Sequence, residues 1–209
     1  MSLLARCHSL RYAREHAAHL PGVGAAHARV TVWTIGHSTR TAEEFIDVLA
    51  AHEIEAVVDV RRFPGSRRLP QFGSAALSTS LRAAGVSYRW VESLGGRRRP
   101  DPASPNDAWE NEAFRGYADH TESEEFAEGL FELSMISSGL RTAIMCAELL
   151  WWRCHRRIIA DVLVFLDYGV HHIRDFDAAE IHELASPARV VNGGLTYASP
   201  TIQLDFYDT

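Results

Sequence analysis

The order of the short apolar runs is the feature that most constrains how this chain folds. Runs rich in β-branched and aromatic residues alternate with stretches whose apolar residues recur every three or four positions, as in an amphipathic helix. The strand-like runs cover residues 30–35, 55–60, 86–91, 141–146 and 170–173. Alternating strands and helices joined by right-handed crossovers are typical of an α/β fold. We therefore expect an open, mainly parallel sheet of about five strands with helices on both faces, a Rossmann-like three-layer sandwich.

Local signals predict where the first helices begin and end. Thr41 with Glu44 three residues later forms a capping box, which predicts a helix to about residue 52. Ser74 is the expected N-cap of a second helix, and Gly85 is expected to end it in the left-handed conformation. Helical spacing also extends over residues 114–134 and 152–167.

The length of 209 residues fits one domain with a substantial core. We expect an α/β domain over residues 30–175, an N-terminal extension over 1–29 and a loop-rich C-terminal tail over 176–209. Three cysteines are too few for a disulfide framework and favour a reducing compartment, so the predicted location is cytoplasmic. No apolar run reaches the ~20 residues of a membrane span, so no membrane association is expected.

Polar residues follow the predicted strands, at positions that a parallel sheet would bring to one edge. In such sheets ligands bind beyond the carboxyl ends of the strands, so we expect these residues to form one site. They are, in chain order, His37, Ser38, Asp59, Arg61, Arg62, Gly95, Gly96, Arg97, Cys146, Glu148, Cys154, His155 and Arg156. The net charge of −6 indicates no general affinity for nucleic acid, so the clustered arginines predict a local anion site.

Several of these residues have two interpretations. Asp59 could act as a base while Arg61 and Arg62 clamp an anion, or it could be a buried carboxylate paired with its neighbouring arginine. His37 and Ser38 are either a base and a hydroxyl donor or the polar side chains of a turn. The arginines that follow Gly95 and Gly96 indicate either an anion-binding loop or a solvated surface. No Walker lysine pattern and no dinucleotide glycine fingerprint is present.

Three roles compete for the segment that contains Cys146, Cys154 and His155. Both thiolates and the imidazole could bind a metal, although their spacing is not that of a zinc finger, and metal is the less favoured role. A thiolate near a helix N-terminus and several arginines could be a nucleophile. Cys146 could instead be a small apolar residue of the core. Glu148 is either an acid catalyst or an ion-paired anchor, and the following tryptophans either stack a ligand or belong to the core.

A series of short motifs resembles the domain-of-unknown-function 488 (DUF488) family. The motifs are Thr34-Ile-Gly-His-Ser38, Asp59-Val-Arg61 with Phe63-Pro64 and Ser66, Pro70-Gln-Phe72, Leu94-Gly-Gly96, Phe114-Arg-Gly-Tyr117, Met145-Cys-Ala-Glu148 and Cys154-His-Arg156. The resemblance covers about residues 31–173. It implies a small cytoplasmic α/β protein of a family whose activity is not established and which is sometimes labelled as related to DNA repair. It transfers no catalytic roles, but it supports one shared site at the strand ends.

The expected function is an enzyme that acts on an anionic substrate, a nucleotide or nucleic-acid component, by hydrolysis or group transfer. We expect catalytic roles for Asp59, Glu148, His37, His155 and Cys146, and substrate binding by Ser38, Arg61, Arg62, Gly95, Gly96, Arg97, Tyr117 and Arg156. The alternatives are a non-catalytic module that binds phosphate or nucleic acid, and a thiol or metal protein that uses Cys146, Cys154 and His155. No cofactor is predicted, and the sequence indicates no particular oligomeric state.

Overall fold

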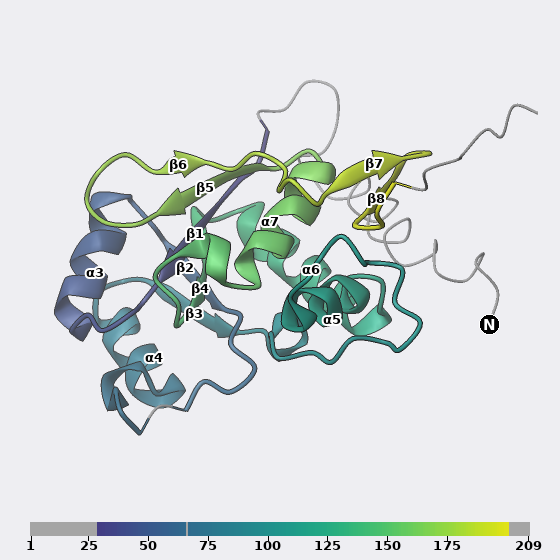
Figure 1. Ribbon diagram of the computed structural model, residues 1–209. Helices are drawn as coiled ribbons and strands as arrows, with labels where there is room; N and C mark the ends of the chain where they lie inside the picture. Colours follow the sequence, from purple (N-terminus) through teal and green to yellow (C-terminus); the bar gives the residue numbers. More distant parts are fainter. Residues whose placement is uncertain (1–28, 66, 201–209) are drawn as a thin grey trace, which may run out of the picture.

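Six strands form one mixed, mostly parallel sheet in the order β3-β2-β4-β1-β5-β6 (Figure 1). The computed structural model describes residues 29–65 and 67–200. The parallel strands are β1 (Thr31–Gly36), β2 (Ala56–Asp59), β3 (Ser87–Trp90), β4 (Thr142–Cys146) and β5 (Gly169–Ile173). The sixth strand, β6 (Glu180–Ile181), pairs antiparallel with β5 and was not predicted.

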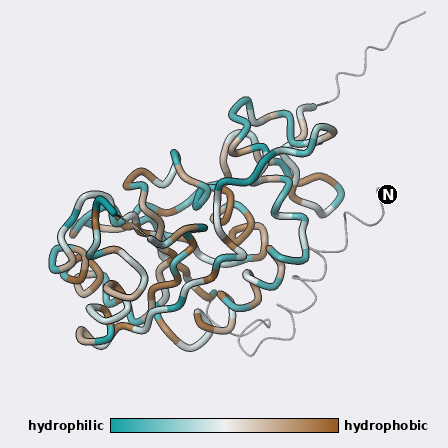
Figure 2. The backbone as a smooth tube through the Cα atoms, turned by 90° about the horizontal axis from the view of Figure 1, so that it is seen from below, coloured by the Kyte–Doolittle hydropathy of each residue, from teal (hydrophilic) through white to brown (hydrophobic). Residues whose placement is uncertain are grey.

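Helices cover both faces of the sheet, which confirms the predicted three-layer α/β fold. One face carries α3 (Ala42–Ala51) and α4 (Ser74–Ala83), and the other carries α5 (Glu112–His120), α6 (Glu124–Ser137) and α7 (Arg156–Phe165) (Figure 1). Alternate residues of each strand point to opposite faces, so Trp33 and Ile35 pack with α3 and α4, whereas Val32 packs with α7. Figure 2 shows the hydrophobic stretches running through the interior of the fold, with hydrophilic loops around them.

The helix boundaries follow the capping signals with two differences. The Thr41 capping box forms, and Gly85 adopts a φ of 77° after α4, both as predicted. Ser74 was wrongly predicted as an N-cap, because Gly73 takes that position and no side chain caps α4. The helical stretch over residues 114–134 contains two helices, since Ser123 interrupts it and caps α6 by accepting a hydrogen bond from the Phe126 amide.

The chain beyond residue 175 packs against the domain. After β6, strands β7 (Arg189–Val191) and β8 (Gly194–Thr196) form a hairpin, which lies beside the end of α7 in Figure 1. Its Asn-Gly turn has positive φ at both residues, as a tight hairpin requires. The segment predicted as a loop-rich tail thus contains three short strands. Among residues 29–65 and 67–200, no helix combines the length and apolar character needed to cross a membrane.

Strands β1 and β4 lie side by side at the point where the chain changes direction. The connection from β1 leads through α3 to β2, and the connection from β4 leads through α7 to β5, on the opposite side of the sheet. This is the topological switch point at which open α/β sheets bind ligands. The amides of His37 and Ser38 donate to the carbonyls of Cys146 and Ala147, each at 3.0 Å, so the two loops that leave the switch point stay in contact.

Candidate functional site

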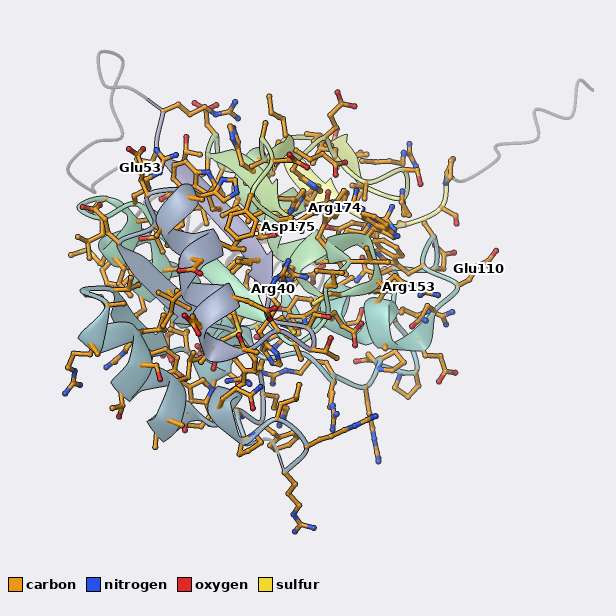
Figure 3. The ribbon with its side chains drawn as sticks, turned by 90° about the vertical axis from the view of Figure 1, so that its left-hand side faces the viewer. Arg40, Glu53, Glu110, Arg153, Arg174 and Asp175 are labelled. Atoms are coloured by element: carbon orange, nitrogen blue, oxygen red, sulfur yellow. The ribbon has the colours of Figure 1, made fainter. Side chains whose placement is uncertain are left out.

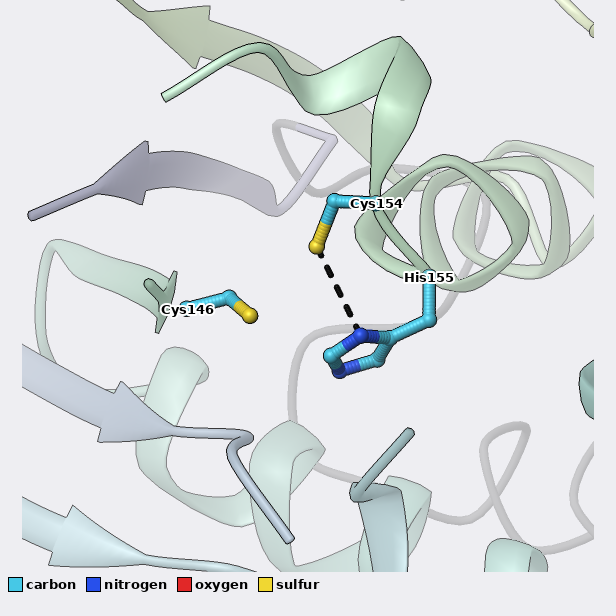
Figure 4. A group of neighbouring side chains, drawn as sticks. All are labelled: Cys146, Cys154 and His155. Atoms are coloured by element: carbon cyan, nitrogen blue, oxygen red, sulfur yellow. Dashed lines mark hydrogen bonds between the residues drawn. The ribbon is translucent and has the colours of Figure 1, made fainter. Parts of the chain in front are cut away.

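Two cysteines and a histidine converge beside the carboxyl end of β4 (Figure 4). Cys146 is the last residue of β4, and Cys154 and His155 directly precede α7. The two sulfur atoms and a ring nitrogen of His155 lie within 4.8 Å of one another, and the Cys154 Sγ is 3.5 Å from His155 Nδ1. Both cysteines are buried. The structure therefore brings together the three residues that the metal and thiol interpretations required.

The ring of His155 is held in one orientation. Its Nε2 lies 2.9 Å from the carbonyl oxygen of Val60, an arrangement in which Nε2–H donates and Nδ1 keeps a lone pair directed at the thiols. The Tyr117 ring packs against the imidazole at a centroid distance of 5.0 Å. A Cβ at Gly96 would lie 2.8 Å from Nδ1, so only glycine leaves room on that side of the ring.

The two thiols differ in acidity. Burial raises the pKa of the Cys154 thiol, but a hydrogen bond from the Cys146 thiol and the neighbouring His155 and Arg156 outweigh burial and hold that pKa well below its ordinary value. The hydrogen bond to Cys154 and then burial raise the pKa of the Cys146 thiol. Cys154 is therefore the thiol that ionises first, with Cys146 as its hydrogen-bond donor.

Arg156 is a fully buried cation next to this thiol pair. Its guanidinium donates to the backbone carbonyls of Glu148 and Leu149 and, at 3.4 Å, to the Thr34 hydroxyl, while its Nε has no partner. None of the salt bridges formed within the described residues involves Arg156. Arg156 was predicted to bind substrate, and the structure shows that it holds the loop after β4 in place.

A buried relay connects Arg156 to a carboxylate on α7. The Thr34 hydroxyl is 2.8 Å from His172 Nδ1, His172 Nε2 is 2.9 Å from His182 Nδ1, and His182 Nε2 is 2.9 Å from Asp161. Burial, followed by the nearby His182, lowers the pKa of His172 to about 2, so its ring is neutral. The donors of this relay can then all point in one direction, from Arg156 toward Asp161.

Asp59 and Arg61, at the end of β2, form a buried ion pair. Arg61 Nε lies 2.8 Å and 3.1 Å from the two carboxylate oxygens of Asp59, and Nη2 lies 2.5 Å from one of them. The Arg61 amide and the Tyr88 hydroxyl also donate to this carboxylate. The arrangement is the one expected of a carboxylate paired with its neighbouring arginine, the second interpretation of Asp59.

His37 lies beside this pair. Its Nε2 is 3.3 Å from Arg61 Nη1, its Nδ1 is 2.9 Å from the Ser38 carbonyl oxygen, and its ring stacks on Phe72. Burial lowers the pKa of His37 to about 4, so the ring is neutral at pH 7. Ser38 adopts a φ of 51°, which is consistent with its place in a turn.

Arg62, Phe63 and Arg97 form a second group, here called the Phe63 platform. The Phe63 ring is 62% exposed, and the guanidinium carbons of Arg62 and Arg97 each lie 5.9 Å from its centroid. No salt bridge of the described residues involves either arginine. Sequence reasoning assigned no role to Phe63, although an aromatic residue directly after two arginines in a strand-end loop was the available signal.

The loop of Gly95 and Gly96 joins the Phe63 platform to the thiol cluster. A Cβ at Gly95 would lie 2.7 Å from the Arg62 Cα, and a Cβ at Gly96 would meet the His155 ring. Glycine is thus needed at both positions, because the loop passes in close contact with Arg62 and His155. The platform and the cluster therefore lie on either side of this loop.

Two further side chains hold this loop. The buried Tyr117 hydroxyl donates to the Leu94 carbonyl oxygen at 2.7 Å, so Tyr117 positions the loop; its predicted role in substrate binding stays a prediction. Arg98 donates to the Gly95 carbonyl and pairs with Glu125. Arg98 therefore has a structural role that Arg97, its neighbour, does not share.

Glu148 lies at the exposed side of the site. Its carboxylate makes no hydrogen bond or salt bridge within the described part of the chain, and its backbone carbonyl faces Gly36, where a Cβ would lie only 1.9 Å away. Three more arginines, Arg40, Arg153 and Arg174, lie across the middle of the view in Figure 3. Of these, Arg40 donates to the carbonyls of Gly36 and Arg174, which ties the turn after β1 to the end of β5.

Comparison with known proteins gave one match. The family model described as "Domain of unknown function DUF488" matches residues 41–163. This range extends from the N-cap of α3 into α7 and contains every predicted site residue except His37 and Ser38. No curated protein and no solved structure matched the chain.

Proposed function

We propose that this chain, which belongs to the DUF488 family, is an enzyme acting on an anionic substrate, a nucleotide or nucleic-acid component, by hydrolysis or group transfer. The substrate would bind at the carboxyl edge of β1, β2 and β4. The observation that carries the proposal is the contact of Gly95 with Arg62 and of Gly96 with His155, which makes the Phe63 platform and the thiol cluster neighbours.

The Phe63 platform has the composition that a nucleotide requires of its binding surface. An exposed aromatic ring can stack on any base, and unpaired guanidiniums attract and hydrogen-bond phosphate. Because Arg62 and Arg97 have no carboxylate partner, a phosphate does not have to displace one. The combination of an exposed aromatic ring with two unpaired arginines therefore supports a nucleotide or nucleic-acid substrate more specifically than the number of arginines does.

The groups suited to proton transfer or nucleophilic attack lie on the far side of the glycine loop. Cys146, Cys154 and His155 provide thiols and an oriented imidazole, and the exposed Glu148 carboxylate remains the proposed acid or base at the open side. We assign Asp59 a positioning role, since its carboxylate is occupied by Arg61 and Tyr88.

Binding can be tested by fluorescence anisotropy with a labelled single-stranded oligonucleotide and with the duplex of the same sequence, over a series of salt concentrations. We expect Phe63→Ala to weaken binding by roughly 5-fold to 150-fold, the equivalent of about 1–3 kcal/mol for one stacked base. Removing one phosphate contact by Arg62→Ala or Arg97→Ala should lower the salt slope by about 0.7 for a single strand. Arg82→Ala is the matched control, because Arg82 is an exposed arginine in the last turn of α4, near the opposite edge of the sheet.

Turnover needs a separate measurement. The same oligonucleotides and a set of nucleoside monophosphates would be incubated with the protein and analysed by mass spectrometry for any change of mass. A product formed by the parent but not by His155→Ala, with Arg82→Ala unimpaired, supports the enzyme. Binding that depends on the Phe63 platform without any chemical change would contradict it and favour the non-catalytic module.

A further inference from the structure

We propose that Cys146, Cys154 and His155 bind one zinc ion. The inference goes beyond the proposed function, because a metal held by these side chains does not depend on the identity of the substrate. It also modifies that proposal in one part: as zinc ligands the three side chains would not act as nucleophile or base, and Glu148 would be the acid or base. Two thiolates and one imidazole are a ligand set that zinc favours, and three protein ligands leave a fourth position for water or a substrate atom.

The distances fit a tetrahedral site. With Zn–S near 2.3 Å and Zn–N near 2.0–2.1 Å, the S···N edge of a zinc tetrahedron is about 3.6 Å and the S···S edge about 3.8 Å. The measured distance between Cys154 Sγ and His155 Nδ1 is 3.5 Å. Since all three ligand atoms lie within 4.8 Å of one another, an S···S separation has to shorten by at most about 1.0 Å and an S···N separation by at most about 1.2 Å.

The surroundings of His155 are those of a metal ligand. Metal-binding histidines usually donate their second ring N–H to a carboxylate or backbone carbonyl, which fixes the tautomer and the ring plane. The Val60 carbonyl oxygen is such an acceptor for Nε2, and it leaves the Nδ1 lone pair directed at the thiols. Figure 4 shows this nitrogen and both sulfur atoms facing the same space from the end of β4 and the start of α7.

The glycine loop keeps the approach to Nδ1 clear. The nearest atom to an added Cβ at Gly96 would be Nδ1 itself, at 2.8 Å, followed by Cγ at 3.1 Å. An alanine at residue 96 would clash with the ring that provides this nitrogen. Glycine at residue 96 therefore leaves space at Nδ1, the atom that would bind the metal.

Charge indicates the nature of the fourth ligand. Zinc with two thiolates is neutral, and the fully buried Arg156 beside them forms no salt bridge with any described residue. A hydroxide or an anionic substrate atom in the fourth position would place a negative charge near this cation. A zinc ion here would thus stand next to the Phe63 platform with a position suited to an anion.

The test begins with protein purified without a metal-affinity tag or chelator. We expect elemental analysis to find one zinc per chain, and metal-free protein titrated with Co²⁺ to show thiolate-to-cobalt charge-transfer absorption that Zn²⁺ then abolishes. Cys146→Ser, Cys154→Ser and His155→Ala should each lower zinc affinity by more than the ~10–100-fold typical of losing an outer-shell contact, and Gly96→Ala should lower it by about that amount. Cys7→Ser is the matched control and should bind as the parent does.

The cobalt titration of the parent protein keeps the proposal falsifiable if any variant fails to fold. Absence of stoichiometric zinc together with absence of the charge-transfer band would overturn it. A disulfide between Cys146 and Cys154 in metal-free protein would also overturn the proposal if the protein still failed to bind zinc after an added reductant had cleaved that disulfide. A metal that remains bound at full affinity in both Cys146→Ser and Cys154→Ser would place the metal elsewhere and would also overturn the proposal.

Discussion

Replacing the neighbours Arg61 and Arg62 separately by methionine should have different effects: Arg61→Met should lower stability, and Arg62→Met should weaken oligonucleotide binding without lowering stability. Methionine retains an apolar stem of similar reach and removes the guanidinium in both cases. Arg61 is 6% exposed and forms the bidentate pair with Asp59, whereas Arg62 is partly exposed and lies over Phe63. The charge of Arg61 therefore serves folding, and under the proposed function the charge of Arg62 would serve ligand binding.

The loss in free energy of unfolding expected for Arg61→Met depends on how Asp59 is satisfied after the guanidinium has been removed. Removing one partner of a buried ion pair destabilises a protein by about 3–5 kcal/mol, because a buried charge stays uncompensated. The Arg61 amide and the Tyr88 hydroxyl would still donate to Asp59, so we expect the lower end of this range. For a chain of this size, about 2–4 °C per kcal/mol gives a fall in Tm of roughly 6–12 °C at about 3 kcal/mol. Arg62→Met should stay within about 0.5 kcal/mol of the parent.

Urea denaturation followed by circular dichroism measures the first effect, and oligonucleotide anisotropy measures the second. We expect Arg61→Met to unfold at lower urea with an unchanged m value, and Arg62→Met to unfold as the parent does while binding with a lower salt slope. The reasoning is refuted if Arg61→Met loses less than about 1 kcal/mol, or if Arg62→Met loses as much stability as Arg61→Met does.

Two further predictions concern the buried polar groups. Burial lowers the pKa of His172 to about 2 and that of His37 to about 4, both from 6.5, so below pH 6.5 the unfolded state binds protons that the folded state does not. The free energy of unfolding should therefore fall by roughly 2 kcal/mol per histidine between pH 7 and pH 5, and His172→Gln should lessen this slope in urea titrations at several pH values. A pH-independent stability over this range would show that these rings are solvated. Tyr197→Phe removes only the hydroxyl that donates to Asp161 at 3.0 Å, and it should destabilise the fold by about 1.5–3 kcal/mol, measured by urea denaturation. No change would mean that the segment after residue 175 does not dock on α7.

Local patterns were sufficient for much of the architecture. The strand runs, the Thr41 capping box and the left-handed Gly85 are each determined by neighbouring residues, so they could be predicted without tertiary information. The clustering of the candidate residues could also be predicted, because the carboxyl ends of parallel strands share one edge. Cys146, Cys154 and His155 were expected near this edge, and the structure brings them together.

The remaining features depend on contacts between residues distant in the chain. Whether an arginine is buried or exposed is not encoded in its neighbours: Arg61 and Arg62 are adjacent, yet only Arg61 reaches a carboxylate in the interior. The relay from Thr34 to Asp161 includes His182, which joins through β6, a strand too short for a periodic signal. Propensity and spacing cannot indicate such links, which form only after the sheet and α7 have packed.

A crystal structure with a short single-stranded oligonucleotide is the measurement that tests the central claim most directly, namely that the Phe63 platform and the thiol cluster form one site. We predict a base stacked on Phe63, a phosphate within hydrogen-bond distance of Arg62 or Arg97, and the adjoining nucleotide beside Gly96, next to His155. An oligonucleotide bound at another edge of the sheet, with the Phe63 platform unoccupied, would contradict the account.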